Sequence, residues 1–344
     1  MDPSGERIGH GGPPSRCLTS AMPNLQLVIE SSPHLRTAES IPRIMWTVAG
    51  TLAPAAAMGV YLFGPRAVLL ILASLLGALL AEVLADRWRL SLWRVPSDGS
   101  AFVTGLLLAL CLPPGFPLFE AFLGGLVAIA VGKQVFGGLG HNIFNPALVG
   151  RAFLQAAFPV EITTWAAPNP SGWRKLGVDA LTGATPLAQM KFEHVAPALE
   201  KLFIGTTGGS LGETSALALV IGGAVLLALR YIDWRVPLGM IGTVFLFTAL
   251  LRLINPAAYP DPVSQVFAGG LMLGAWFMAT DMVTTPLTSG GRLVFAVGCG
   301  VLVVIIRIWG GLPEGVMYSI LLMNAVTPLI NRYMEPHRFA EAAS

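Results

Sequence analysis

Long apolar runs, separated by short polar or glycine- and proline-rich stretches, make up most of the chain after residue 38. A helix that crosses the roughly 30 Å hydrocarbon core of a bilayer needs about 20 mostly apolar residues. The pattern predicts ten membrane segments, at about 44–63, 67–85, 101–112, 118–136, 144–158, 214–229, 236–254, 263–279, 293–309 and 315–330. The third is too short to cross as one straight helix and stops at Pro113-Pro114-Gly115, so we expect interrupted helices. The predicted fold class is an all-α integral membrane protein.

The two groups of five segments share an internal repeat. Three matched pairs lie 173 positions apart: Pro113 with Pro286, Gly125 with Gly298, and Gly137-Gly138-Leu139 with Gly310-Gly311-Leu312. Because each copy holds an odd number of helices, the second copy must enter the membrane from the opposite side. The sequence therefore predicts two inverted five-helix repeats, a fold whose binding sites lie between the repeats near the bilayer midplane.

Basic residues near the helix ends predict the orientation of the chain. If the chain starts in the cytoplasm, most of these residues fall on the cytoplasmic side, where an excess of Lys and Arg is expected. Both termini are then cytoplasmic. The predicted parts are a cytoplasmic N-terminal tail (1–38), a first five-helix repeat (39–158), an extracytoplasmic segment (159–213), a second five-helix repeat (214–332) and a cytoplasmic C-terminal tail (333–344).

Composition supports the same class. Hydrophobic residues make up 54% of the chain and charged residues only 12%, which excludes an ordinary soluble domain. The formal net charge of +2 gives no reason to expect a nucleic-acid partner. Cys17, Cys111 and Cys299 have no CxxC spacing, so they supply neither a disulfide framework nor a full set of iron–sulfur ligands. No metal site is predicted.

The polar segment 177–187 carries a candidate attachment site. Its core, Thr182-Gly183-Ala184-Thr185, resembles the attachment signal for a flavin held through its phosphate. The small residues also leave the backbone open around a hydroxyl. Asp179 stands six residues before Thr185 as a metal or proton partner for phosphoryl transfer. A threonine hydroxyl is a poor nucleophile, so a dedicated transferase is expected. The alternative is an ordinary turn built from small residues beside Thr and Pro.

A second candidate site lies at the junction after the fourth segment. Here His141, Asn142 and Asn145 follow a glycine-rich stretch. Irregular backbone at membrane depth must line a cavity or be covered by protein, so these side chains are predicted to face a buried ligand. A capped surface loop is the alternative.

Four carboxylates stand close to apolar segments and are candidates for coupling to ion movement. They are Asp281, Glu82, Glu213 and Glu314. A cation that crosses the membrane needs oxygen ligands of this kind. Each can equally cap a helix or bond to a neighbouring helix, and Glu82 can extend to the interface beside Arg87 and Arg89.

Several separated motifs, in order, resemble the family of RnfD and NqrB membrane subunits from residue 31 onward. The motifs are Ser32-Pro33-His34-Leu35-Arg36 with Ile41-Pro42-Arg43, Gly140-His141-Asn142-Ile143-Phe144-Asn145-Pro146-Ala147, Asp179 through Pro186, Gly209-Ser210-Leu211-Gly212-Glu213-Thr214-Ser215, Ala279-Thr280-Asp281, and Gly310-Gly311-Leu312-Pro313-Glu314-Gly315. Residues 1–30 lie outside the resemblance.

The resemblance implies a cofactor, a complex and a location. Thr185 would carry FMN through a phosphoester bond made from FAD by a flavin transferase, with Thr182, Gly183 and Ala184 as the recognised motif. The chain would be one component of a translocase in the bacterial cytoplasmic membrane that moves electrons between ferredoxin and NAD and couples this to Na+ or H+ transport. Its partners would be RnfA, RnfB, RnfC, RnfE and RnfG, and the flavin would face the periplasmic or extracellular side. A second, non-covalent flavin such as riboflavin is left open.

Two rival classes remain. One is a channel or carrier for a small neutral solute, since five-plus-five inverted repeats also resemble urea and ammonium transport proteins. The other is a scaffold that only holds redox partners together. Neither requires a covalent flavin at Thr185, so its presence or absence separates them from the redox component.

Overall fold

The computed structural model describes residues 39–87, 98–166, 168, 184–193, 198–205, 207–256 and 258–334. The chain divides into Met1–Ala38 and Glu39–Ser344, and all described residues belong to the second unit. The predicted N-terminal tail, nearly all of the predicted C-terminal tail and positions 169–183 of the predicted extracytoplasmic segment therefore lie outside the described residues.

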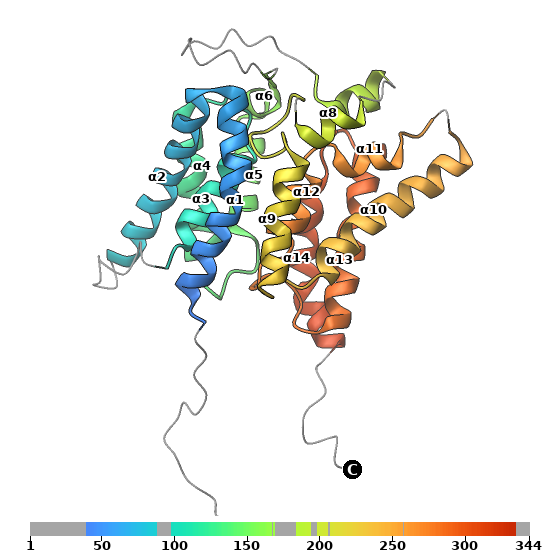
Figure 1. Cartoon of the computed structure of the whole chain (residues 1–344). Coiled ribbons are helices and arrows are strands. Elements are labelled where there is room, and N and C mark those ends of the chain that lie inside the picture. The colour runs from blue at the N-terminus through green and yellow to red at the C-terminus, as the bar shows by residue number, and fades with distance from the viewer. Residues whose placement is uncertain are drawn as a thin grey trace, which may run out of the picture. The chain divides into compact units, whose positions relative to one another are not determined.

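The described residues form helices and contain no strand, as the fold class predicts (Figure 1). The first half holds α1 (Ile41–Phe63), α2 (Pro65–Arg87), α3 (Ser100–Leu110), α4 (Leu118–Ile129) with its π-helical extension η1 (Ala130–Gln134), and α5 (Pro146–Ala157). Between the halves lie α6 (Pro159–Thr163), α7 (Pro186–Ala188), η3 (Gln189–Glu193) and α8 (Leu199–Ile204). The second half holds α9 (Ala216–Ala228), α10 (Arg235–Ile254), α11 (Pro262–Phe267), α12 (Leu271–Leu273), η4 (Gly274–Met278), α13 (Ser289–Trp309) and α14 (Val316–Tyr333).

A helical element lies at each of the ten predicted segments, but only some have the length of a membrane span. Four described helices are long and apolar enough to cross a bilayer: Ile41–Phe63, Pro65–Ala85, Arg235–Ile254 and Ser289–Trp309. Two more, Ser100–Leu110 and Ala216–Ala228, are apolar but shorter. A multi-pass α-helical protein is therefore supported, whereas the number of ten spans stays a prediction.

The predicted span 263–279 is not one continuous helix. It is divided at Ala268–Gly270 into α11 and the α12–η4 segment, and Gly269 there has a φ of 67°. Glycine adopts this left-handed conformation without the steric cost that a Cβ brings. Gly64 plays the same role in the tight turn between α1 and α2, with a φ of 75°.

Short polar side chains begin several helices. Ser215 accepts a hydrogen bond from the backbone of Ala218 at the start of α9, and Thr288 accepts one from Gly291 at the start of α13. Such caps satisfy N–H groups that have no partner inside the helix. These caps set the first residue of each helix, and so also set where the preceding loops, which carry candidate site residues, end.

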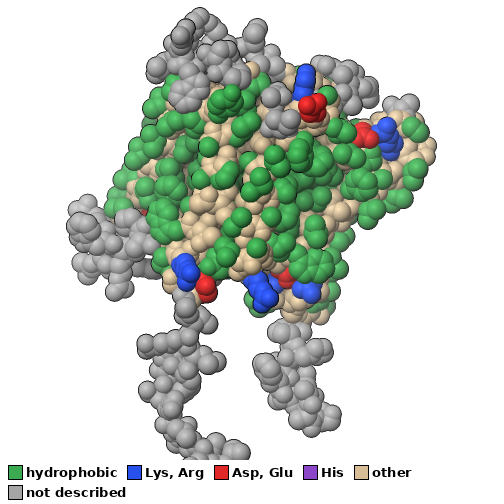
Figure 2. Space-filling view, viewed as in Figure 1, with side chains coloured by type: hydrophobic (Ala, Val, Ile, Leu, Met, Phe, Trp, Pro, Cys, Tyr) green, Lys and Arg blue, Asp and Glu red, His purple; other side chains and the backbone are tan. Residues whose placement is uncertain are grey.

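Small residues let the helices pack closely. A Cβ added at Gly77 of α2 would lie 2.0 Å from the carbonyl oxygen of Phe122 in α4, and one added at Gly125 of α4 would lie 2.2 Å from the carbonyl oxygen of Ser74. Contacts of this kind are typical of helix pairs in membranes, where close packing drives association. Figure 2 shows the matching surface: apolar side chains cover the middle of the visible face, and charged side chains lie toward its two ends.

Residues 39 and 334 lie at the same end of the helix bundle. Glu39 accepts a hydrogen bond from Tyr231, and Met334 lies near Gly290 at the start of α13. The elements between the halves, α6 and α8, lie at the opposite end (Figure 1). We call these the terminal end and the Thr185 end of the bundle.

Candidate functional site

A cavity of about 350 Å³ at the Thr185 end has Thr185 in its wall. Ala184 and Ala188 line it beside the threonine, and the aromatic rings of Trp165 and Tyr318 line it from other elements. The volume falls within the range of cavities that hold small organic ligands. The predicted attachment residue therefore faces a space of ligand size.

Thr185 is held in a defined conformation at the start of α7. Its hydroxyl oxygen accepts a hydrogen bond from the backbone of Ala188 at 3.2 Å, and Pro186 fills the first helical position. The residue is only 7% exposed. Its hydroxyl proton is not needed for this cap, so an ester at the oxygen leaves the cap possible. The motif residues Thr182 and Gly183, and Asp179, lie outside the described residues.

Lys191 fixes the segment that carries Thr185 against the second half. Its ammonium donates to the carbonyl oxygens of Gly310 at 2.5 Å and Leu312 at 3.3 Å. These carbonyls belong to the loop between α13 and α14, which also carries Glu314. The contact brings Thr185 and Glu314 into the wall of one cavity.

Two predicted carboxylates, Glu213 and Glu314, lie together beside this cavity. A Cβ added at Gly270 would lie 3.0 Å from Oε1 of Glu213 and 3.6 Å from Oε1 of Glu314, so both carboxyl groups face the same backbone. Arg151 from α5 forms an ion pair with Glu314. The cluster thus joins the first half, the second half and the loop before α9.

The two carboxyl groups differ in proton affinity. Burial raises the pKa of Glu213 well above its usual value, and the charge of Glu314 raises it further. Burial also opposes ionisation of Glu314, but the charge of Arg151 outweighs it and holds the pKa of Glu314 below its usual value. Two carboxylates in contact cannot both ionise easily. Of the two, Glu213 therefore has the greater affinity for a proton.

Glu82, another predicted coupling residue, is part of a buried ion pair. Lys133 donates to Oε1 of Glu82 at 2.6 Å and to the hydroxyl of Ser100 at 2.7 Å, and its side chain is 2% exposed. This pair connects α2, α3 and η1. Burial of a carboxylate is expected only with such a partner, so the contact gives Glu82 a structural role.

Asn142 and Asn145 line a second, smaller cavity of about 100 Å³ between the halves, together with Lys133 and Asp281. Asn145 caps α5 through its Oδ1 and donates from Nδ2 to the carbonyl oxygen of Met278 at 3.3 Å, which links the two halves. Oδ1 of Asn142 is buried without a hydrogen-bond partner among the described residues. His141 is exposed and does not line this cavity.

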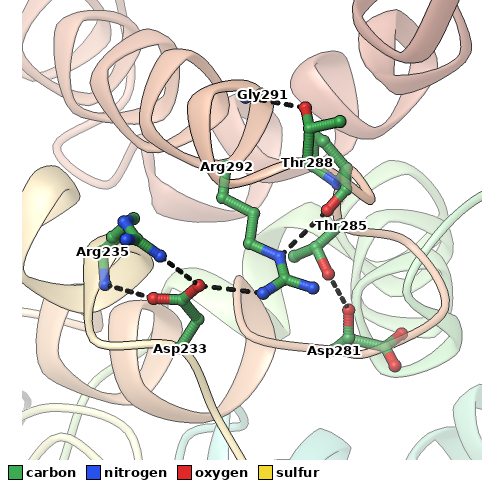
Figure 3. Close-up of polar contacts among 8 residues, drawn as sticks. Asp233, Arg235, Asp281, Thr285, Thr288, Gly291 and Arg292 are labelled. Carbon is green, nitrogen blue, oxygen red and sulfur yellow. Dashed lines mark hydrogen bonds and ion pairs between the residues drawn. The ribbon is translucent and has the colours of Figure 1, made fainter. Parts of the chain in front are cut away.

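Asp281 is engaged locally in the break between η4 and α13. Its carboxylate accepts from the backbone of Val283 and the hydroxyl of Thr284, both at 3.3 Å. Thr285 donates to the carbonyl oxygen of Asp281 at 2.8 Å (Figure 3). These bonds organise the break, and Asp281 still reaches the wall of the smaller cavity.

Three buried basic residues were not singled out as site residues from the sequence: Lys133, Arg151 and Arg307. Arg307 of α13 donates to the carbonyl oxygens of Gln265 at 2.6 Å and Ala268 at 3.0 Å, and so satisfies the end of α11. Each stands alone in an apolar run. A charged residue inside such a run is a signal of a buried partner or ligand, and it could have marked all three.

Comparisons with known proteins agree with the motifs. The model of the NQR2, RnfD, RnfE family matches residues 28–340. The D component of a proton-translocating ferredoxin:NAD(+) oxidoreductase complex from Clostridium ljungdahlii is 46% identical, covering 90% of this chain and 95% of the relative. The D component of an ion-translocating oxidoreductase complex from Stutzerimonas stutzeri is 43% identical, covering 88% and 93%.

A further relative carries a different ion in its name. The D component of a Na(+)-translocating ferredoxin:NAD(+) oxidoreductase complex from Acetobacterium woodii is 41% identical, covering 91% of this chain and 95% of the relative. The family model and these relatives extend over nearly the whole body that contains both cavities and the carboxyl pair. This chain therefore belongs to the NQR2, RnfD, RnfE family.

Proposed function

We propose that this chain is a membrane component of an ion-translocating oxidoreductase complex and that it carries FMN covalently on Thr185. Two kinds of observation support the proposal. Relatives that match over at least nine tenths of their own length are named as the D component of such complexes. The observation that carries the FMN assignment is the buried hydroxyl of Thr185 in the wall of a cavity of ligand size.

The cavity fits the chemistry of a flavin ring. Trp165 and Tyr318 offer aromatic surfaces, Met317 offers an apolar one, and Arg151 lies at the wall as a donor. A bound flavin would supply one- and two-electron redox chemistry. The chain's part is to hold the ring through Thr185, to limit the access of water and to place charged groups near it.

The Glu213–Glu314 pair supports coupling between electron and ion movement at this site. Both carboxyl groups share a cavity wall with Thr185, and the pKa of Glu213 is raised by burial and by the charge of Glu314. A change of charge in the cavity would therefore alter the affinity of the pair for a proton or a cation. The degree of sequence identity does not indicate which ion is transported, because relatives at 46% and 41% identity are named for H+ and Na+ respectively.

The proposed location is the bacterial cytoplasmic membrane, with both termini in the cytoplasm and Thr185 on the outer side. The described residues support this arrangement, since residues 39 and 334 share one end of the bundle and Thr185 lies at the other. We include RnfA, RnfB, RnfC, RnfE and RnfG as partners in the complex, and a flavin transferase for maturation.

The inverted repeat also remains a proposal, supported by the packing of the helices. α2 packs on α4 in the first half as α10 packs on α13 in the second. Counterparts also meet across the halves, α1 with α9 and α5 with α14. Contacts between equivalent elements are expected around a pseudo-two-fold axis.

A second, non-covalent flavin is proposed for the cavity lined by Asn142, Asn145 and Asp281. The unpartnered oxygen of Asn142 and the ring of Phe277 suit a flavin's polar edge and face. The cavity of about 100 Å³ is smaller than the roughly 300 Å³ usual for small-molecule sites, so binding would require its side chains to move apart.

In-gel fluorescence tests the covalent flavin. The full chain is expressed together with a flavin transferase, denatured, separated on a gel and viewed under ultraviolet light. We expect a fluorescent band for the natural chain and none for Thr185→Val, which keeps the shape of the side chain and lacks the hydroxyl. Flavin recovered from the supernatant after acid precipitation measures any non-covalent flavin in the same sample.

Thr163→Val is the matched control, because Thr163 lines the same cavity and its hydroxyl bonds only to backbone carbonyls of α6. It should remain fluorescent. A dark natural chain would favour a channel, carrier or scaffold over a redox component. Supernatants without flavin would remove the second flavin from the proposal.

A further inference from the structure

A groove of about 760 Å³ opens at the terminal end of the bundle, away from Thr185. It lies between the α9–α10 loop, the start of α10, the start of α13 and the break that precedes α13. Arg230, Arg235 and Arg292 line it, and Asp233 is the one acid among the described residues of its wall. Three arginines against one aspartate leave two positive charges in the groove.

Two of the arginines are held in place by that acid (Figure 3). Asp233 accepts from Arg235 at 3.1 Å and from Arg292 at 2.8 Å, and the Nε of Arg292 donates to the carbonyl oxygen of Pro286 at 3.1 Å. Each guanidinium has five N–H donors, so both retain donors beyond these bonds. The groove therefore presents fixed, only partly used donors.

The charges around the groove do not cancel. Burial opposes ionisation of Asp233, but hydrogen bonds from the backbone of Arg235 and from the two guanidiniums outweigh it and keep its pKa below the usual value. Glu39 bonds to Tyr231 at the rim and also pairs with Arg43, so it brings no net charge. Arg230 is exposed and forms no ion pair with any residue that the structure describes. Asp281 stands between Thr280 and Met282 of the wall but lines the smaller cavity and not the groove. The side chains that line the groove therefore keep an excess of two positive charges.

The starts of two long helices add to this positive field. α10 begins at Arg235 and α13 at Ser289, so the positive ends of both helix dipoles face the groove. Neither first turn contains an acidic residue, and both carry an arginine near the start. Asp233, just before α10, already accepts a hydrogen bond from the backbone of Arg235, whereas α13 is capped only by the neutral side chain of Thr288. An anion in the groove would supply the missing negative charge at the start of α13.

The surface next to the groove is apolar. Trp234 at its edge is 52% exposed, and Arg235 stacks over its ring. One turn further along the helices, Leu238 of α10 and Leu293 of α13 are each about half exposed. Exposed tryptophan beside charged residues is typical of the membrane interface, and the exposed leucines continue toward the apolar middle of the bundle.

We propose that this groove binds the phosphate of an anionic phospholipid, with the acyl chains lying along the exposed apolar faces of α10 and α13. The polar groove and the adjoining apolar surface match the two parts of an amphiphile. A free anion would use only the first part, and an acidic protein surface would leave the second part exposed. The site does not depend on the flavin at Thr185.

Native mass spectrometry of the full chain in a neutral detergent tests the proposal. The chain is titrated with dioleoylphosphatidylglycerol and, separately, with zwitterionic dioleoylphosphatidylcholine. We expect phosphatidylglycerol to bind more tightly, and Arg230→Gln to weaken it about fivefold, the effect of one basic residue near an anionic lipid. Adding Arg292→Gln should weaken it by a similar factor again.

Arg332→Gln is the matched control, since Arg332 lies near the same end of the bundle and does not line the groove. It should leave binding unchanged. Weaker lipid binding in Arg230→Gln would not be caused by misfolding, because Arg230 lacks the bonds that Arg292 makes to Asp233 and Pro286. Equal binding of the two lipids, equal loss in Arg332→Gln, or full displacement of phosphatidylglycerol by millimolar inorganic phosphate would overturn the proposal.

Discussion

Lys133 shows what a single buried charge requires. Its ammonium lies among apolar helices, and it is compensated by Glu82 and by the hydroxyl of Ser100. Removing a charge from water is costly, and a pair offsets that cost only while both partners remain. The ion pair with Lys133 therefore accounts for the burial of Glu82, without any role in ion movement.

The first prediction concerns this pair. Glu82→Leu leaves the ammonium of Lys133 without a counter-charge, so we expect the free energy of unfolding to fall by about 3–5 kcal/mol, the usual cost of breaking a buried pair. The double variant Glu82→Leu with Lys133→Met buries no charge and should lose much less. Denaturant unfolding of the natural chain, Glu82→Leu, Lys133→Met and the double variant in detergent measures the coupling.

Additive losses in that cycle would show that the two side chains do not depend on each other. If the double variant folds well and the assembled complex still moves ions, Glu82 leaves the group of coupling candidates.

Sequence alone marked Glu82 but not its partner. The two residues lie 51 positions apart on different helices. Lys133, near the end of its predicted segment, served only as one of the basic residues that predict the orientation of the chain. The same limit applies to Arg151, which meets Glu314 only through the fold. Individual acidic residues could be predicted as unusual, whereas their pairing depends on how the helices pack.

At the scale of elements, the internal repeat places Gly125 of α4 and Gly298 of α13 at matched positions with different surroundings. A Cβ at Gly125 would meet backbone, 2.2 Å from the carbonyl oxygen of Ser74. A Cβ at Gly298 would meet the tip of Met323, at 2.6 Å from its methyl carbon. Methionine is flexible and can move aside, and backbone cannot.

We therefore expect Gly125→Ala to lower the free energy of unfolding by about 1–3 kcal/mol, as overpacking usually does. Gly298→Ala should be close to neutral, because alanine favours the helix and Met323 can yield. Gly242→Ala in α10 is the control, since nothing lies within 4 Å of its added Cβ. The free energies of unfolding are measured with denaturant in detergent. A larger loss in Gly298→Ala than in Gly125→Ala would contradict the packing around these two glycines.

The positions of the helices could be predicted better than their continuity. The apolar runs predicted a helical element at every segment, but the run 263–279 is divided at Ala268–Gly270. The average hydrophobicity of the run does not reveal the interruption of the helix, because alanine and glycine are themselves apolar. The Gly269-Gly270 pair was the available signal.

For the molecule as a whole, the Thr185 cavity draws on three separate regions. Arg151 comes from α5, Thr185 from the segment between the halves, and Glu314 from the loop between α13 and α14. Composition and ordered motifs predicted the membrane class and the family. They could not predict which charged residues would surround Thr185, since that depends on contacts between the halves.

Peptide mass analysis tests the central claim most directly. Protein matured with a flavin transferase is digested with trypsin, which cuts after Lys175 and Lys191 and so releases the peptide 176–191 containing both Thr182 and Thr185. We predict that this peptide gains the mass of one FMN less one water, with fragmentation placing the addition on Thr185. An unmodified peptide, or an addition placed on Thr182, would contradict the account.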